Sequence, residues 1–264
     1  MAIPARLLLP VAVPGLLLAP WAAFAAHPLQ TEDTGTQGTA NVEIENGFSN
    51  ARFDSTTVAT YQPQLSIGVA NSVDAILQPA LVRVRSPQQA SVTGWGDTNL
   101  DAKWRFWSSD PWSLALRGGV LAPTGRKGLT RGEASEHALL VATWKDAPTT
   151  VHANVGLTRL ARAPGARASV AQVSAAVMQS IDNGLVLAAD GELHQDPDPA
   201  RKTWPGSLLG GLIWTARPGL DLDIGYQRSF SAQPVNRQWM AGLTWRFSLQ
   251  GPGQRSTIAM RSGE

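Results

Sequence analysis

The chain has 264 residues, enough for one large all-β domain or for two domains of ordinary size. It contains no cysteine, which excludes a disulfide framework and any thiolate metal site. Its 22 basic residues exceed its 20 acidic residues by only two and are scattered along the chain, so no nucleic-acid-binding footprint is present and no nucleic-acid partner is expected.

The first 26 residues have the pattern of a secretory signal peptide. An early arginine precedes an apolar run, and Ala23-Phe24-Ala25 fits an A-x-A cleavage site. We therefore expect export, with cleavage near Ala25 or Ala26. A membrane anchor is the alternative, but three prolines interrupt an apolar run that is already shorter than the roughly 20 residues a spanning helix needs.

Twelve later segments alternate apolar and polar residues with a period of two, the pattern of strands with two different faces. The alanine-rich segment 168–181 could equally be helical, and we interpret it as a strand because its neighbours need a partner. The predicted strands are 42–49, 61–69, 75–85, 97–107, 112–122, 138–145, 149–159, 168–181, 185–194, 207–215, 220–230 and 238–248.

The connections between these segments alternate in length. Tight turns are predicted at 71–74, 108–111, 146–148, 182–184 and 217–219, and longer polar loops at 50–55, 86–96, 123–134, 160–167, 195–205 and 231–237. Outer-membrane barrels have short periplasmic turns, longer extracellular loops and an even number of strands. A soluble β-sandwich is the alternative, because alternation within a single strand does not exclude it.

The fold predicted from these patterns is all-β: an antiparallel, up-and-down transmembrane β-barrel of about 12 strands spanning residues 39–248. Uniform strand length, the sorting of loops by side and tryptophans that share the apolar face favour the barrel over the sandwich. A polar tail, 249–264, follows the last strand, although outer-membrane barrels usually finish on an aromatic residue. The tail either hangs in the periplasm or leaves the insertion signal to be read internally.

The segment 97–107, DTNLDAKWRFW, sets the orientation of the two faces. If the apolar face contacts lipid, the polar face must line the lumen. The lumen-lining candidates are Glu43, Glu45, Arg83, Arg85, Asp97, Asp101, Lys103, Arg105, His152, Asn154, Asp190, Glu192, Asp221, Asp223 and Arg246. The candidates for the lipid-facing surface or its aromatic girdle are Leu100, Trp104, Phe106, Trp112, Trp144, Tyr226, Trp239, Trp245 and Phe247. The luminal charges either orient a solute or only pair across strands.

Several short motifs occur in a characteristic order. They are TEDTGTQG, GWGDTNLDAKWRF, PTGRKGLTRG, HANVGLTR, LDLDIGYQRSF and GLTWRF. Together they resemble the outer-membrane transporter family named for the meta-pathway of phenol degradation, across nearly the whole mature chain. The resemblance implies a bacterial outer-membrane barrel that passes small, often aromatic or apolar molecules. It supplies no catalytic or binding residues.

An enzyme is a weaker interpretation. Three histidines and a few polar neighbours could be combined on paper into a hydrolase: His137, His152 and His194 with Ser135, Asp190 and Glu192. No G-x-S-x-G elbow, metal-ligand spacing or phosphate-binding G-x-x-x-x-G-K-[ST] loop accompanies them. We predict no catalytic site, no cofactor and no bound metal.

The predicted function is a passive channel for small molecules in the bacterial outer membrane. Twelve strands predict a narrow or partly occluded lumen, and the polar segment 27–38, at the periplasmic end, is expected to fold into it as a partial plug. The expected partners are outer-membrane lipid, an unidentified small solute and the barrel-assembly machinery. The alternatives are a non-conducting structural or sensory barrel and a soluble periplasmic β-sandwich that binds a ligand.

Overall fold

The computed structural model describes residues 27–87, 89–130, 132–160, 165–182, 184–230 and 236–249. The expected signal peptide and most of the polar C-terminal tail lie outside these residues. No helix within them is long and apolar enough to cross a membrane. Their strands are β1 (Asn41–Phe53), β2 (Thr56–Ala70), β3 (Val73–Gln78), β4 (Leu81–Ser86), β5 (Gln89–Trp95), β6 (Thr98–Ser109), β7 (Trp112–Ala122), β8 (Ser135–Asp146), β9 (Thr149–Arg159), β10 (Ser169–Asp182), β11 (Leu185–His194), β12 (Gly206–Arg217), β13 (Leu220–Phe230) and β14 (Asn236–Ser248).

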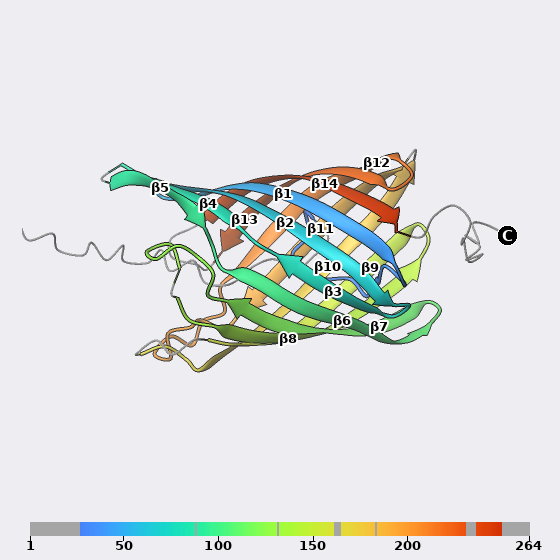
Figure 1. The fold of residues 1–264 in the computed structure, drawn as a ribbon, viewed down its shortest axis with the longest axis horizontal. Helices are drawn as coiled ribbons and strands as arrows, with labels where there is room; N and C mark the ends of the chain where they lie inside the picture. Colours follow the sequence, from blue (N-terminus) through green and yellow to red (C-terminus); the bar gives the residue numbers. More distant parts are fainter. Residues whose placement is uncertain are drawn as a thin grey trace, which may run out of the picture.

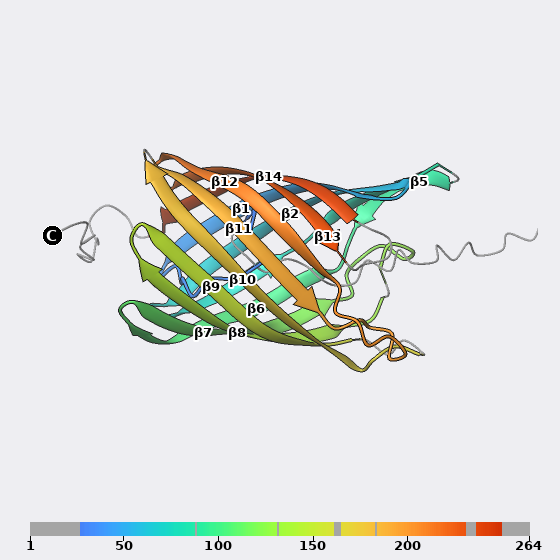
Figure 2. The ribbon, with the colours of Figure 1, turned by 180° about the vertical axis from the view of Figure 1, so that it is seen from behind.

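These strands form one antiparallel sheet that closes on itself (Figures 1 and 2). Closure comes from β1, which pairs with β2 on one side and with β14 on the other, from Asn41 opposite Ser248 to Phe53 opposite Asn236. β3 and β4 both pair with β2, and they pair in turn with β6 and β5. β3 and β4 together therefore occupy one strand position in the wall, and β6 and β5 together occupy the next. The predicted 12-stranded barrel is confirmed.

The break between β3 and β4 falls at residues 79 and 80. Pro79 has no N–H to donate to a strand ladder, so the third predicted strand, 75–85, does not run through it. Beyond the break, β4 and β5 form a hairpin that projects past the other strands, at the far end from the label C in Figure 1. The long loop predicted at 86–96 is therefore wrong, because Gln89–Trp95 carries strand-forming residues that pair with β4.

The other predicted strands are found with small changes at their ends. The alanine-rich segment is strand β10, paired with both β9 and β11. The loop predicted at 50–55 is instead a two-residue turn, because β1 and β2 continue to Phe53 and Thr56. Asp54 occupies this turn with a φ of 48°, a left-handed conformation that aspartate tolerates better than most residues.

Burial alternates along the strands with the polar side chains inside. In β6, Asn99, Asp101 and Lys103 are buried, whereas Leu100 and Trp104 are exposed. A water-soluble domain has the opposite arrangement, because its apolar side chains leave water on folding. An apolar outer face around a closed sheet is the arrangement that a lipid bilayer requires.

Candidate functional site

Residues His27–Gly38, here called the luminal segment, lie inside the barrel and have no regular secondary structure. The chain reverses direction between this segment and β1, where Gly38 has a φ of 76° and Ala40 a φ of 62°. The segment passes very close to β2 at this point. A Cβ atom on Gly68 would lie 1.7 Å from the carbonyl oxygen of Gly38, so the close approach requires glycine on the wall.

Side chains of the barrel wall bind the backbone of the luminal segment. The Asp190 carboxylate on β11 accepts hydrogen bonds from the backbone nitrogens of Gln30 at 2.6 Å and Thr31 at 2.8 Å. The Asn154 side chain on β9 accepts from the Glu32 nitrogen at 2.7 Å and donates to its carbonyl oxygen at 2.9 Å. These wall groups replace the strand partner that the segment lacks and satisfy its buried backbone.

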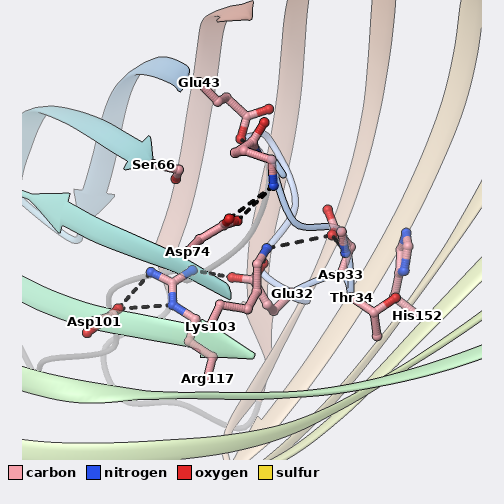
Figure 3. A network of polar contacts seen from close by, with 12 residues as sticks. Glu32, Asp33, Thr34, Glu43, Ser66, Asp74, Asp101, Lys103, Arg117 and His152 are labelled. Atoms are coloured by element: carbon pink, nitrogen blue, oxygen red, sulfur yellow. Dashed lines mark hydrogen bonds and ion pairs between the residues drawn. The ribbon is translucent and has the colours of Figure 1, made fainter. Parts of the chain in front are cut away.

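A buried charged cluster holds the middle of the segment (Figure 3). The Glu32 carboxylate accepts hydrogen bonds from Lys103 Nζ at 2.9 Å and from Arg117 Nη1. Arg117, whose side chain is 0% exposed, also donates through Nη2 to Asp101 Oδ2 at 2.8 Å. His137 Nε2 lies 3.0 Å from the other Asp101 oxygen. Two carboxylates face two permanent cations, so removal of any member leaves a buried charge without its partner.

Asp33 stands beside this cluster, outside the spanning strands. Burial raises the pKa of its carboxyl group, but the charges of Lys103 and His152 act in the opposite direction and leave that pKa below its ordinary value. Lys103 Nζ lies 3.7 Å from Asp33 Oδ1. The ionised form of Asp33 is therefore favoured in the folded protein.

Apolar side chains cover another part of the lumen. Leu29 of the luminal segment packs against Ala176, Ala188, Leu209 and Met240, which come from β10, β11, β12 and β14. A second cluster, Ala115, Leu139 and Val141, is almost completely buried between β7 and β8. The inner wall is thus partly apolar. Sequence reasoning missed these side chains because it assigned apolar residues to lipid by default.

The luminal segment lies between two cavities. One, of about 70 Å³, is lined by Ser49, Thr60 and other residues toward the end with the longer loops. The other, of about 460 Å³, is lined by Ser108, Lys145 and other residues toward the end with the tight turns. His27 and Leu29 line both cavities. The amino-terminal part of the segment is therefore the partition between them.

The polar candidates occupy three kinds of position. Those that the structure buries are Glu43, Glu45, Asp101, Lys103, His152, Asn154, Asp190 and Asp223. Asp97, Arg105, Glu192 and Asp221 are half-buried, and the more exposed Arg246 bonds to both Glu43 and Asp221. The structure thus brings most of them together around the luminal segment, but their role toward a solute stays a prediction.

Arg83 and Arg85 were wrongly assigned to the lumen. Both are exposed and lie on the face opposite Val82, which packs with Val58 and Ala80 in a buried cluster. Arg83 and Arg85 belong to the β4–β5 hairpin, which lies at the far end of the barrel from the label C in Figure 1, where they face Ala59 and Thr57 near the start of β2. We attribute the error to this position, because an outer face clear of the bilayer can carry charges and leave apolar side chains to fill the inside.

The apolar candidates lie on the outer face. Large exposed side chains among them are Leu100, Trp104, Phe106, Trp112, Tyr226, Trp239 and Trp245. Trp144 and Phe247 are only half-buried, the latter with its ring 4.9 Å from that of Trp245. Sequence reasoning missed Phe48, Trp107 and Trp214, which are also exposed. Trp107 follows a bulge in β6 that interrupts the alternation on which the prediction relied.

The residues of the hypothetical hydrolase have other partners. His137 contacts Asp101, His152 Nδ1 lies 2.8 Å from Thr143 Oγ1, and Asp190 binds the luminal segment. Within the described part of the chain, no group of three or more metal-ligating side chains is arranged to hold an ion.

A closed antiparallel barrel with an apolar outer face and a largely polar lumen defines an outer-membrane β-barrel. The family described as "Putative MetA-pathway of phenol degradation" matches residues 25–247, and the chain belongs to this family. No curated protein sequence matches it significantly.

Solved outer-membrane channels share the fold. The COG4313 outer membrane channel from Pseudomonas putida F1 is 11% identical, with a TM-score of 0.67 over 81% of this chain and 97% of that one. The NanC porin is 10% identical, with a TM-score of 0.53 over 77% and 98% of the two chains. The KdgM porin is 8% identical, with a TM-score of 0.54 over 77% and 99%. At these identities the likeness is one of fold.

Proposed function

We propose that the protein is a passive channel for small apolar or aromatic molecules and that the luminal segment is its constriction. The observation that carries this proposal is the position of His27 and Leu29, which line the cavities on both sides of the segment. A solute crossing the barrel has to pass this partition or displace it. No step requires a chemical reaction, and we assign the protein no catalytic role.

The lining of the lumen supports the solute class. Leu29, Leu209 and Met240 offer an apolar surface beside the partition, whereas Lys103 and Arg117 of the luminal wall are bound to Glu32 of the segment. An apolar molecule gains free energy by leaving water for such a surface. The family description, which names phenol degradation, points to the same class.

Liposome swelling separates a channel from a non-conducting barrel. Proteoliposomes are mixed with phenol-sized aromatic solutes and, as a matched comparison, with sugars of similar mass. The proposal predicts swelling with the aromatic solutes above the rate of protein-free liposomes, and slower swelling with the sugars. Rates equal to protein-free liposomes for every solute would leave the structural or sensory barrel as the better interpretation.

Deletion of residues 27–38 tests the constriction itself. If the luminal segment closes the barrel, the truncated protein should show a larger single-channel conductance in planar bilayers than the full-length protein. Heat-modifiable migration on a detergent gel controls for folding, because a folded barrel migrates differently from the heated chain. Unchanged conductance in a folded truncated barrel would refute this role.

A further inference from the structure

The amino-terminal end of the luminal segment lies in an acidic seat. The backbone nitrogen of His27 donates to Glu45 Oε2 at 3.0 Å, and the His27 ring nitrogen Nδ1 contacts Asp223 Oδ1. Glu45 comes from β1 and Asp223 from β13, and their exposed fractions are only 5% and 8%. Two buried carboxylates from different strands therefore converge on one end of the chain segment.

The basic side chain that contacts this seat is the imidazole of His27, which pairs with Asp223 and is charged only if protonated. Among the described residues, neither Glu45 nor Asp223 has a lysine or arginine side chain within ion-pair distance. The second oxygen of Glu45 accepts from the neutral amide of Gln64 at 2.6 Å. Asp223 Oδ2 is buried and has no hydrogen-bond partner among the described residues. A buried carboxylate without a compensating cation is strongly unfavourable, so the geometry calls for a positive group here.

Glycines on the wall make room for this end of the segment. A Cβ atom on Gly47 would lie 2.8 Å from the His27 ring, and one on Gly242 would lie 2.4 Å from His27 Nδ1 and 2.3 Å from the unpartnered Asp223 oxygen. Gly225 is similarly close to Pro28, at 3.0 Å. Because strands rarely carry glycine without such a reason, the seat is shaped for this particular part of the chain.

His27 also lies next to the leader cleavage site expected from the sequence, near Ala25 or Ala26. We propose that removal of the leader after Ala26 frees the α-ammonium group of His27, and that Glu45 and Asp223 bind this group in the acidic seat. Hydrolysis of the junction by the exporting cell's leader peptidase consumes one water molecule. It leaves a carboxyl group on the leader and a protonated amine on the mature chain. This amine brings a positive charge and three N–H donors where an amide has one donor and no charge.

The proposal goes beyond channel function, because it concerns how the chain end is held and makes no assumption about a solute. It predicts that leader removal generates the group that fixes the amino-terminal end of the partition. The direction in which folding shifts the pKa of the α-amine distinguishes binding by the two carboxylates from burial of the amine alone. Burial alone lowers the pKa of an amine, whereas paired carboxylates raise it.

The test uses the full-length mature protein isolated from outer membranes. Intact-mass measurement first identifies the amino-terminal residue, which the proposal requires to be His27. Acetylation of the α-amine by an N-hydroxysuccinimide ester is then followed by peptide mass spectrometry across the ordinary α-amino pKa of about 7.7–8.0. The pH of half-maximal labelling should be higher in the folded barrel than in the heat-denatured chain. Glu45→Gln and Asp223→Asn should each lower it. The control Glu136→Gln, which alters a solvent-exposed ion pair, should not.

Three results would overturn the proposal. One is an amino terminus at any residue other than His27. Another is a labelling midpoint that falls on folding, and the third is a raised midpoint that neither seat variant changes. The comparison of folded with denatured wild-type protein remains decisive even if both variants fail to fold. Channel activity is not measured, so a failure of the proposed transport function would leave these outcomes unaffected.

Discussion

Replacing Glu32 by glutamine should release the luminal segment while leaving the barrel closed. Glu32 accepts charge-assisted hydrogen bonds from Lys103 and Arg117. Removing one partner of such a buried ion pair typically costs about 3–5 kcal/mol. The wall is held independently by the pairing of its strands, so most of this cost falls on the docked state of the segment. At about 1.4 kcal/mol per factor of ten, the equilibrium between docked and released states should shift by roughly a hundredfold to several thousandfold.

Single-channel recording in planar bilayers measures this shift directly. The Glu32→Gln protein should spend a much larger fraction of time at a high-conductance level than the wild type does. Glu136→Gln is the matched control, because Glu136 pairs with Arg159 at 3.4 Å but their side chains are 61% and 71% exposed, and exposed pairs contribute little. A Glu32→Gln barrel that folds normally and conducts like the wild type would show that the charged cluster does not hold the constriction in place.

Three other perturbations test the arrangement. Ala102→Arg puts a charge on the lipid-facing side of β6 at a cost of about 2–4 kcal/mol near the midplane, so less protein should reach the heat-modifiable folded form in membrane fractions. Gly68→Ala places a Cβ atom against the Gly38 carbonyl oxygen and should raise conductance by displacing the segment, whereas Gly210→Ala, with no atom within 4 Å of its Cβ, should not. Folding lowers the pKa of Asp33. The contribution of Asp33 to docking of the luminal segment is therefore complete above its unfolded pKa of about 3.9 and is lost as the pH falls through its folded pKa. Conductance should increase only on strong acidification.

The period-two alternation was enough to predict the wall. Four strands, β7, β9, β11 and β13, were predicted residue for residue, because turn-forming residues bound them on both sides. The prediction failed where strands extend beyond the bilayer. Around Arg83 and Arg85 the apolar-outside rule no longer applies, and the residues predicted as a loop there pair as a hairpin. A local pattern does not reveal where along a strand the lipid ends.

The luminal site was predictable only in part. The charged cluster was suggested by the polar face of β6, but its central member, Arg117, was not predicted because it lies among the apolar residues of β7. The binding of Thr31 by Asp190 joins residues 159 positions apart. Such pairs arise from closure of the whole sheet, and a single sequence contains no local signal for them.

The seam between β1 and β14 governs how this protein can be assembled. β1 carries the luminal segment at its start, and β14 is the last strand of the described residues. The cylinder cannot shut until its final strand has been delivered, so the inserted segment has two routes to its place. It either enters sideways through the unsealed seam or threads its free end from the periplasmic mouth afterwards. The luminal segment is therefore synthesised before the wall but completes its contacts after it, because its binding site does not exist until β14 has paired with β1.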